Sequence, residues 1–245
     1  MGNAAHNAPR EWSSISALRH KSAGIATLQL GCEMLIFDFF SGTGSATQAF
    51  RDAGHTVISI ELDAYFNADE RDIMKLDADF LRKKYGQPDF IWASPPCTAF
   101  SVASVSHHWI AGGDNPIPRS QLAKDSQELI EHTLRIIIEL NPSKGWLMEN
   151  PRGMMRKLSI MKKYPRKTVT YCQYGESRMK PTDLWGEVPG WTSRPMCRNG
   201  AKCHEAAPRG AQTGTQGIKG ARLRSRVPIQ LSQELLSVIG GVSDE

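Results

Sequence analysis

Apolar residues along the chain form short runs separated by longer amphipathic stretches. Five runs rich in Ile, Val, Phe and Trp are typical of buried β-strands, and they span residues 34–40, 56–62, 88–94, 145–150 and 167–173. A long helix is predicted within residues 120–140, and a last helix over residues 230–240. Because strands alternate with helices, we predict an α/β fold with a mostly parallel sheet and helices on both faces.

Three of the predicted strands end in turns that carry reactive or ligand-binding residue types. These turns span residues 40–45, 94–97 and 149–151. In a parallel sheet ligands bind beyond the carboxyl ends of the strands. We therefore expect the three turns to meet on one edge of the sheet.

The first turn lies in "DFFSGTGS", residues 38–45, where a strand is followed by a G-x-G turn and a helix start near Ser45. Glycines there let a ligand lie close to the backbone, although an ordinary tight turn has the same pattern. The next strand ends near Glu61, whose carboxylate can accept hydrogen bonds from ribose hydroxyls. The pair favours a nucleotide-like ligand.

The second turn contains Cys97, which follows Pro95 and Pro96. The fixed φ angles of the prolines hold the thiol in a defined direction, and the following "TAFS" has the composition of an open loop rather than core. An inert buried thiol is the alternative. We favour a nucleophile.

The third turn contains Glu149, in "MENPRG", whose carboxyl is expected at the same edge as Cys97. The alternative is an acid at the start of a helix, with Pro151 in its first turn. A thiol and a carboxylic acid beside a nucleotide-like site favour catalysis.

Composition narrows the class of protein. A chain of 245 residues with 40% hydrophobic residues suits one globular domain with a small appendage. Its five cysteines are an odd number, which favours free thiols in a reducing, cytoplasmic setting. No apolar run reaches the roughly 20 residues of a membrane span, and polar residues dilute the leader-like run at residues 21–32. We expect a soluble protein without a membrane partner.

The formal charge of +5 is concentrated in one part of the chain. Residues 187–228 hold eight basic and two acidic residues, a local net charge of +6. Such a segment can bind a polyanion, although a solvated basic loop is equally compatible with it.

The domain organisation follows from these patterns. We predict a peripheral leader over residues 1–33, a catalytic core over 34–186, a small basic target-recognition region over 187–228 and a C-terminal helix returning to the core over 229–245. The basic region contains Cys197, Cys203 and His204, and Cys172 could join them. Their spacing is not a standard zinc pattern, so free thiols and no metal ion are expected.

The segments "DFFSGTGS", "IELD", "ASPPCTAFS", "MENP" and "YCQYGESRMKPTDLW", in this order, resemble the motif series of the DNA (cytosine-5) methyltransferases, most closely the compact phage and prophage enzymes. The resemblance covers about residues 34–185. It implies a Rossmann-like fold, S-adenosylmethionine as cofactor and double-stranded DNA as partner. The target cytosine would be rotated out of the duplex. A monomer without an obligate protein partner is expected, in a phage or restriction-modification context.

The resemblance also implies roles for single residues. Cys97 would attack C6 of cytosine and Glu149 would bind N3, while Gly175 stands where the family has an arginine that holds the base. Arg178 is our substitute for that arginine, with Lys180 second. The expected cofactor-binding residues are Phe40, Gly42, Gly44, Ser45, Glu61, Asp72 and Pro96, with Asp77 and Asp79 as rivals of Asp72. The expected nucleic-acid-binding residues are Ser101, Arg222, Arg224 and Arg226.

Three alternatives stay open. The same chemistry could act on tRNA or other RNA, the chain could be a catalytically silent DNA-binding relative, or the donor could be a derivative of S-adenosylmethionine. The presence of both Cys97 and Glu149 argues against the silent relative. The late Gly-Asn motif of the family is not visible, although residues 224–236 occupy a comparable place.

Overall fold

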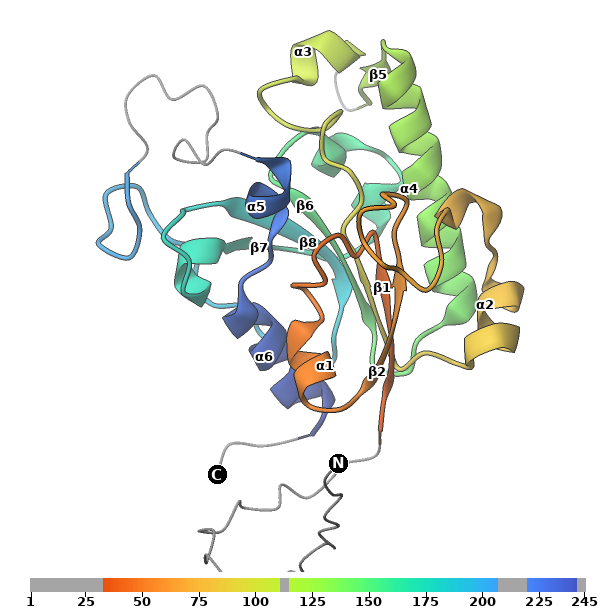
Figure 1. Cartoon of the computed structure of the whole chain (residues 1–245). Coiled ribbons are helices and arrows are strands. Elements are labelled where there is room, and N and C mark those ends of the chain that lie inside the picture. Colours follow the sequence, from red (N-terminus) through yellow and green to blue (C-terminus); the bar gives the residue numbers. More distant parts are fainter. Residues whose placement is uncertain (1–32, 111–114, 207–219, 242–245) are drawn as a thin grey trace, which may run out of the picture. The chain divides into compact units, whose positions relative to one another are not determined.

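A computed structural model describes residues 33–110, 115–206 and 220–241 of the chain. Six strands form one sheet in the order β2-β1-β3-β6-β8-β7 (Figure 1). Their bounds are Leu35–Phe39 (β1), Thr56–Ile60 (β2), Phe90–Ala93 (β3), Trp146–Pro151 (β6), Arg166–Thr170 (β7) and Pro181–Glu187 (β8). Strands β2, β1, β3 and β6 are parallel, whereas β8 runs antiparallel to both of its neighbours. The predicted mostly parallel sheet is confirmed.

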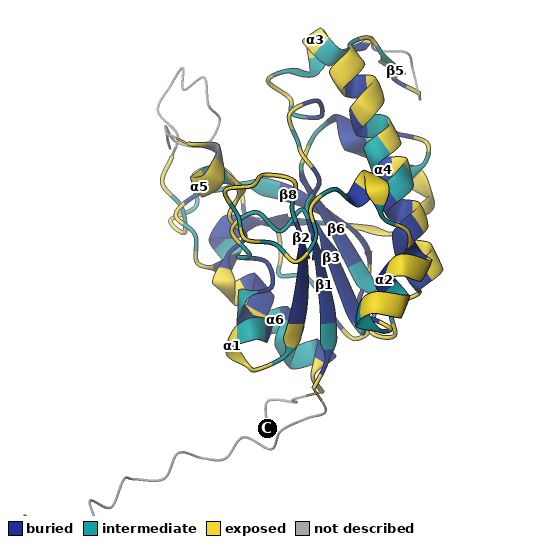
Figure 2. Cartoon of the chain, turned by 45° about the vertical axis from the view of Figure 1, so that its right-hand side comes forward, coloured by how far each residue is buried: buried dark blue, intermediate teal, exposed yellow. Residues whose placement is uncertain are grey.

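Helices cover both faces of this sheet (Figures 1 and 2). On one face lie α2 (Ala78–Tyr85) and α4 (Gln121–Leu140), and on the other lie α1 (Gln48–Asp52) and α6 (Ile229–Ile239). Strand β1 contributes side chains to the hydrophobic cores on both faces of the sheet, because successive side chains of a strand point to opposite faces. Phe37 packs in the cluster that includes residues of α2 and α4, and Ile36 in the cluster that includes residues of α1 and α6.

The long helix α4 begins and ends at clear signals. Ser120 is its N-cap, and the Ser120 Oγ accepts a hydrogen bond from the Ala123 backbone N–H at 3.1 Å. Asn141 ends it in the left-handed conformation, with φ of 48°. The helix predicted within residues 120–140 is therefore confirmed, as is the last helix, α6.

The remaining elements are short. They are the 3₁₀ helices η1 (Ile73–Lys75), η2 (Met154–Lys157), η3 (Met161–Lys163) and η4 (Tyr171–Tyr174), the helices α3 (Val105–His108) and α5 (Ala221–Ser225), and the paired strands β4 (Trp109–Ile110) and β5 (Ile117–Pro118).

Two elements differ from the sequence prediction. The strand predicted over residues 167–173 ends at Thr170, because the chain coils into η4, which Gly175 closes at φ of 87°. Strand β8 begins in the polar sequence "PTD" and was not predicted. It pairs on both sides, so its polar start is buried between β6 and β7.

Several sequence predictions fall on undescribed residues. Residues 1–32, 207–219 and 242–245 lie outside the described residues, and with them nearly all of the predicted leader, part of the basic region and the end of the chain. The predicted domain boundaries stay predictions. Within the described ranges, no helix is both long and apolar enough to cross a membrane.

Candidate active site

Two of the three expected turns follow parallel strands, after β1 and after β3, whereas residues 149–151, expected as a turn, form the end of strand β6. Strand β1 lies between β2 and β3, and β3 lies beside β6. The turn after β3 is tied to both neighbours. The Ser94 N–H donates to the Phe39 carbonyl at 3.0 Å, and the Asn150 Nδ2 donates to the Pro95 carbonyl at 3.0 Å. These three segments therefore share one edge of the sheet, as expected.

The loop that carries Cys97 is fastened on both sides of the thiol. Before it, the buried Asn150 side chain holds the Pro95 carbonyl. After it, the backbone N–H groups of Phe100 and Ser101 donate to the Cys97 carbonyl at 2.9 and 3.0 Å. The backbone on both sides of the thiol is therefore held in place, as a preorganised nucleophile requires.

The segment after Cys97 is part of the core, so the prediction that "TAFS" is an open loop was wrong at its centre. Ala99 and Phe100 are buried, and the Phe100 ring stacks on Trp109 with centroids 5.8 Å apart. A Cβ at Gly153 would lie 2.2 Å from the Phe100 carbonyl oxygen. The close approach of these two loops therefore requires glycine at position 153.

The half-buried Cys97 thiol lies in a mixed electrostatic environment. Burial raises its pKa most, and the negative charge of Glu149 raises the pKa further. The positive charges of Lys180 and Arg224 act in the opposite direction. A nucleophilic thiolate thus depends on the balance of these charges.

Glu149 lies within strand β6, so the alternative in which it opens a helix was wrong. It pairs with Leu184 of β8 and is only 5% exposed. Its Oε1 accepts a hydrogen bond from the Tyr171 hydroxyl at 3.1 Å and lies 3.7 Å from the Lys180 Nζ. The carboxyl group is therefore fixed in position next to a cation.

Lys180 lies closer to the candidate catalytic groups than Arg178 does. The Lys180 Nζ contacts Glu149 and lies 4.6 Å from the centre of the Tyr171 ring. The buried Arg178 side chain pairs with Glu176 and donates to the Arg224 carbonyl at 3.3 Å. The role of Arg178 stays a prediction, and the second choice, Lys180, is better placed. Gly175 replaces the family's arginine at a position where η4 ends in the left-handed conformation.

The turn after β1 has the geometry of a ligand-binding turn. Phe40, Gly42 and Gly44 all have positive φ angles, of 59°, 49° and 68°. A Cβ built on either glycine would meet no atom closer than 3.9 Å, so conformation, not crowding, requires these glycines. Phe40 has no such freedom, and a strained residue of this kind costs about 1–3 kcal/mol and is typical of functional sites.

Glu61 faces this turn. Its Oε2 accepts a hydrogen bond from the Gly42 N–H at 2.9 Å and its Oε1 accepts one from the Asp63 N–H at 2.9 Å. Each carboxylate oxygen has a further lone pair for a ribose hydroxyl. An open turn beside an anchored carboxylate therefore fits the nucleoside part of S-adenosylmethionine.

The other predicted cofactor residues have different surroundings. The Ser45 Oγ accepts a hydrogen bond from the Val227 N–H at 2.9 Å, which ties the C-terminal segment to the turn. The Asp72 side chain caps η1 and pairs with Lys75, and Asp77 caps α2 in the same way. Pro96 is exposed beside Cys97. Their contacts with a cofactor stay predictions.

The predicted nucleic-acid-binding residues lie near the same edge of the sheet or beside it. Arg222 stacks on Tyr65 at 3.6 Å and pairs with Asp63 after β2, while the Arg224 carbonyl accepts a hydrogen bond from Lys180. Helix α5 therefore bridges the two sides of the site. The Ser101 Oγ is hydrogen bonded to Ser104 at 2.8 Å. Contacts of these residues with DNA stay predictions.

A cavity of about 470 Å³ lies between the turn after β1, η4 and the start of α6. Thr43, Ser45, Glu176, Arg226 and Gln230 are among its lining residues, but Cys97, Glu61 and Glu149 are not. It is therefore separate from the candidate catalytic groups. Arg226 lines this cavity rather than the Cys97 site.

Sequence reasoning did not assign roles to two residues that position the site, Asn150 and Tyr171. Asn150 could have been found as a polar residue directly after Glu149 in an apolar strand. Nothing in the sequence pointed to a functional role for Tyr171, since it is one aromatic residue in a strand-like run.

Comparisons with known proteins show to which family the chain is similar. Residues 34–164 match the model of the family described as C-5 cytosine-specific DNA methylase. A protein of Frog virus 3 (isolate Goorha), named a probable DNA (cytosine-5)-methyltransferase, is 30% identical over 222 residues, which are 84% of this chain and 100% of the viral protein.

Solved structures are also similar. The Entamoeba histolytica methyltransferase EhMeth is 13% identical with a TM-score of 0.48, and the match covers 66% of this chain and 55% of that one. The Dnmt2 methyltransferase of S. pombe is 13% identical with a TM-score of 0.44, and the match covers 66% of this chain and 51% of that one. The chain thus spans about half the length of these two structures.

Proposed function

The chain belongs to the C-5 cytosine-specific DNA methylase family, and we propose that Cys97 is the nucleophile with which it methylates cytosine in DNA. Membership confirms the resemblance, the reaction class and S-adenosylmethionine as methyl donor. The single observation that supports the proposed mechanism is the position of Cys97, held at the edge of the sheet by Asn150 and influenced by the charges of Glu149 and Lys180.

The proposed reaction proceeds through a covalent adduct between Cys97 and cytosine. The Cys97 Sγ forms a bond to C6 of cytosine, which moves electron density to C5. S-adenosylmethionine, which the turn after β1 and Glu61 would hold, would supply an electrophilic methyl group; the new bond would form between C5 and the methyl carbon as the bond from that carbon to sulfur breaks and S-adenosylhomocysteine leaves. Loss of the C5 proton to a base then lets the bond between Sγ and C6 break, which releases 5-methylcytosine and returns Cys97 as the thiolate.

Glu149 has two linked tasks in this proposal. Its carboxyl group hydrogen bonds to N3 of the ring as charge develops there, which makes C6 more electrophilic. The negative charge of Glu149 also raises the pKa of Cys97, after the larger effect of burial. Because N3 of cytosine carries no proton, the hydrogen bond to it requires the carboxylic acid form of Glu149. A Glu149 that has gained this proton no longer raises the pKa of Cys97 through its negative charge, so thiolate formation would be coupled to the arrival of the substrate.

Lys180 and Arg224 have supporting tasks. Both lower the pKa of Cys97, and the Lys180 Nζ lies 3.7 Å from Glu149. Lys180 is therefore placed to stabilise the thiolate and to hold the carboxyl group in position. Arg178, which contacts neither group directly among the described contacts, would act by holding the Arg224 backbone through its 3.3 Å hydrogen bond.

The substrate cytosine has to leave the duplex, because C6 is not accessible inside the base stack. We propose that α5 and the rest of the basic region bind the DNA backbone while the base enters the site. The viral relative comes from a frog virus, so it lends no support to the expected phage and restriction-modification context.

Nucleoside mass spectrometry tests the proposal. Duplex DNA and tRNA are each incubated with the protein and S-adenosylmethionine, with Cys97→Ser alongside. We expect 5-methylcytosine in the DNA and none with the variant. Product in tRNA alone would move the proposal to RNA, and equal product with Cys97→Ser would refute the mechanism.

A further inference from the structure

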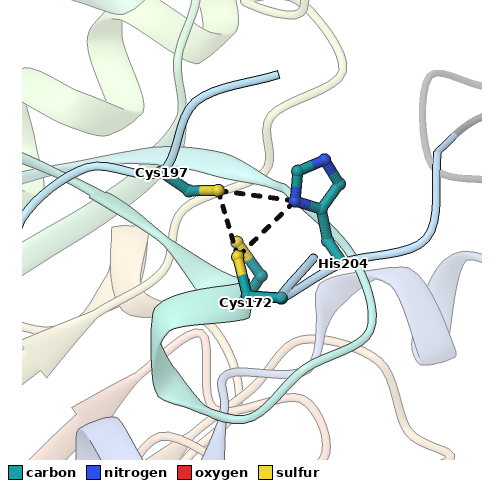
Figure 3. Close-up of side chains that lie close together, drawn as sticks. Cys172, Cys197 and His204 are labelled. Atoms are coloured by element: carbon teal, nitrogen blue, oxygen red, sulfur yellow. Dashed lines mark hydrogen bonds between the residues drawn. The ribbon is translucent and has the colours of Figure 1, made fainter. Parts of the chain in front are cut away.

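Four potential metal ligands meet outside the Cys97 site. They are Cys172, on η4, together with Cys197, Cys203 and His204, from the loop that follows β8 (Figure 3). Their sulfur and ring nitrogen atoms all lie within 4.8 Å of one another. The sequence predicted no metal ion because the spacing of Cys197, Cys203 and His204 is not a standard zinc pattern. Cys172, which the sequence offered as a residue that could join them, supplies a fourth donor in the structure.

The distances suit a tetrahedral zinc ion. The Cys197 Sγ lies 3.2 Å from the Cys203 Sγ and 3.4 Å from the His204 Nδ1, and the Cys203 Sγ lies 3.7 Å from that nitrogen. Zinc bonds of about 2.3 Å to sulfur and about 2.0 Å to nitrogen place tetrahedral ligands about 3.5–3.8 Å apart. Small shifts of the side chains would centre an ion.

We propose that Cys172, Cys197, Cys203 and His204 bind one structural Zn²⁺ ion. Three thiolates and one imidazole are a ligand set that zinc takes in closed, four-coordinate structural sites, with no position left for a substrate. Cys172 and Cys197 are buried and would shield the ion from water on their side, whereas Cys203 is exposed. Soft thiolate ligands also favour zinc over magnesium or calcium.

A disulfide or a set of free thiols explains the cluster less completely. A disulfide between Cys197 and Cys203 would use two of the three sulfurs and would not explain why His204 and the buried Cys172 lie beside them. Free thiols would leave the convergence of two distant segments unexplained. The Gln173 Nε2 also donates to the Cys203 Sγ at 3.4 Å, a contact that suits a thiolate ligand.

The ion would link the basic region to η4, next to the candidate catalytic residues. Cys172 directly follows Tyr171, whose hydroxyl donates to Glu149, whereas Cys203 and His204 lie in the basic region. Arg194 makes a parallel connection, since its Nη1 donates to the Gln173 carbonyl at 2.6 Å. Zinc would thus join the start of the predicted target-recognition region to η4, the helix whose Tyr171 hydrogen bonds to Glu149. This site does not depend on the proposed reaction, because zinc binding and methyl transfer are measured separately.

Metal analysis of the full-length protein tests the proposal. The protein is purified under reducing conditions without a metal-affinity tag, dialysed, and measured by inductively coupled plasma mass spectrometry. We expect one zinc ion per chain in the wild type and loss of the bound zinc in Cys203→Ser and His204→Gln. Cys97→Ser, which also removes one thiol, is the matched control and should keep its zinc. Zinc at background level in the wild type, or unchanged in both ligand variants, would overturn the proposal.

A second measurement covers variants that fail to fold. Co²⁺ is added to wild-type protein from which zinc has been removed with a chelator, and the visible spectrum is recorded. We expect the intense d–d bands of tetrahedral, thiolate-bound Co²⁺, and their loss when Zn²⁺ is added in equal amount. A spectrum of octahedral Co²⁺, or a Cys197–Cys203 disulfide found by mass spectrometry of the freshly purified protein, would refute the zinc site.

Discussion

Replacing Asn150 with alanine should let the loop that carries Cys97 shift relative to the sheet. The Asn150 side chain is fully buried, and its Nδ2 donates to the Pro95 carbonyl at 3.0 Å. The variant leaves that carbonyl without its donor, which costs about 1–3 kcal/mol of unfolding free energy. For a chain of this size the melting temperature should fall by roughly 2–4 °C per kcal/mol. The larger effect should be on catalysis, because a misplacement of about 1 Å can cost roughly 100-fold in rate.

Single-turnover methylation, measured at a temperature where both proteins are folded, separates the two effects. Thr133→Val is the matched control, because it removes a buried hydrogen bond, from the Thr133 Oγ1 to the Leu129 carbonyl at 2.7 Å, within α4. Thr133→Val leaves the Leu129 carbonyl inside α4 with its helical N–H donor, so its stability and rate should stay close to those of the wild type, whereas Asn150→Ala should lose about 10- to 100-fold in rate. A rate for Asn150→Ala within two-fold of that of Thr133→Val would refute the positioning role of Asn150.

Three further predictions follow from charges near the site. Burial and then Glu149 raise the pKa of Cys97, and Lys180 lowers it. Glu149→Gln should therefore speed the alkylation of Cys97 by iodoacetamide at neutral pH, and Lys180→Met should slow it. A change of the alkylation rate in the same direction in both variants would contradict this electrostatic account. Burial, the largest cause, raises the pKa of Asp38 from 3.8 to about 6, so the folded state holds this proton more tightly than the unfolded state and stability is lost as the pH rises through about 6. The unfolding free energy of Asp38→Asn relative to wild type, measured with urea, should therefore increase by about 2 kcal/mol from pH 4 to pH 8, and a constant difference would refute this. If Arg224 neutralises one phosphate, Arg224→Ala should weaken DNA binding and reduce the magnitude of the slope of log K against log salt concentration by about 0.9. Lys163→Ala, outside the basic region, is the control and should leave this slope unchanged. Equal slopes for both variants would exclude Arg224 from the DNA interface.

The parallel part of the fold could be predicted from the sequence because its strands are apolar throughout. Strands β1, β3 and β6 are buried on both faces, and the reactive residues follow them directly or lie near their ends. The convergence of Cys97 and Glu149 on one edge followed from the rule that ligands bind at the carboxyl ends of parallel strands.

The residues that the sequence did not reveal act through tertiary contacts. Strand β8 begins with polar residues because Asp183, fully buried, is paired with Arg156 rather than exposed to solvent. Phe100 resembled a loop residue because its stacking partner, Trp109, lies nine residues further along the chain. Cys172 and His204 are distant in sequence, and only the path of η4 and the loop after β8 brings them together.

Trapping of the covalent intermediate tests the central role of Cys97 most directly. A duplex oligonucleotide carrying 5-fluorocytosine at target sites is incubated with the protein and S-adenosylmethionine and then analysed on a denaturing gel. Fluorine at C5 cannot leave as a proton does, so the bond between Cys97 and C6 should persist and the protein should migrate as a stable DNA adduct, which peptide mass spectrometry locates at Cys97. Adduct formation by Cys97→Ser, or methylated DNA from the wild type without any trapped adduct, would contradict the account.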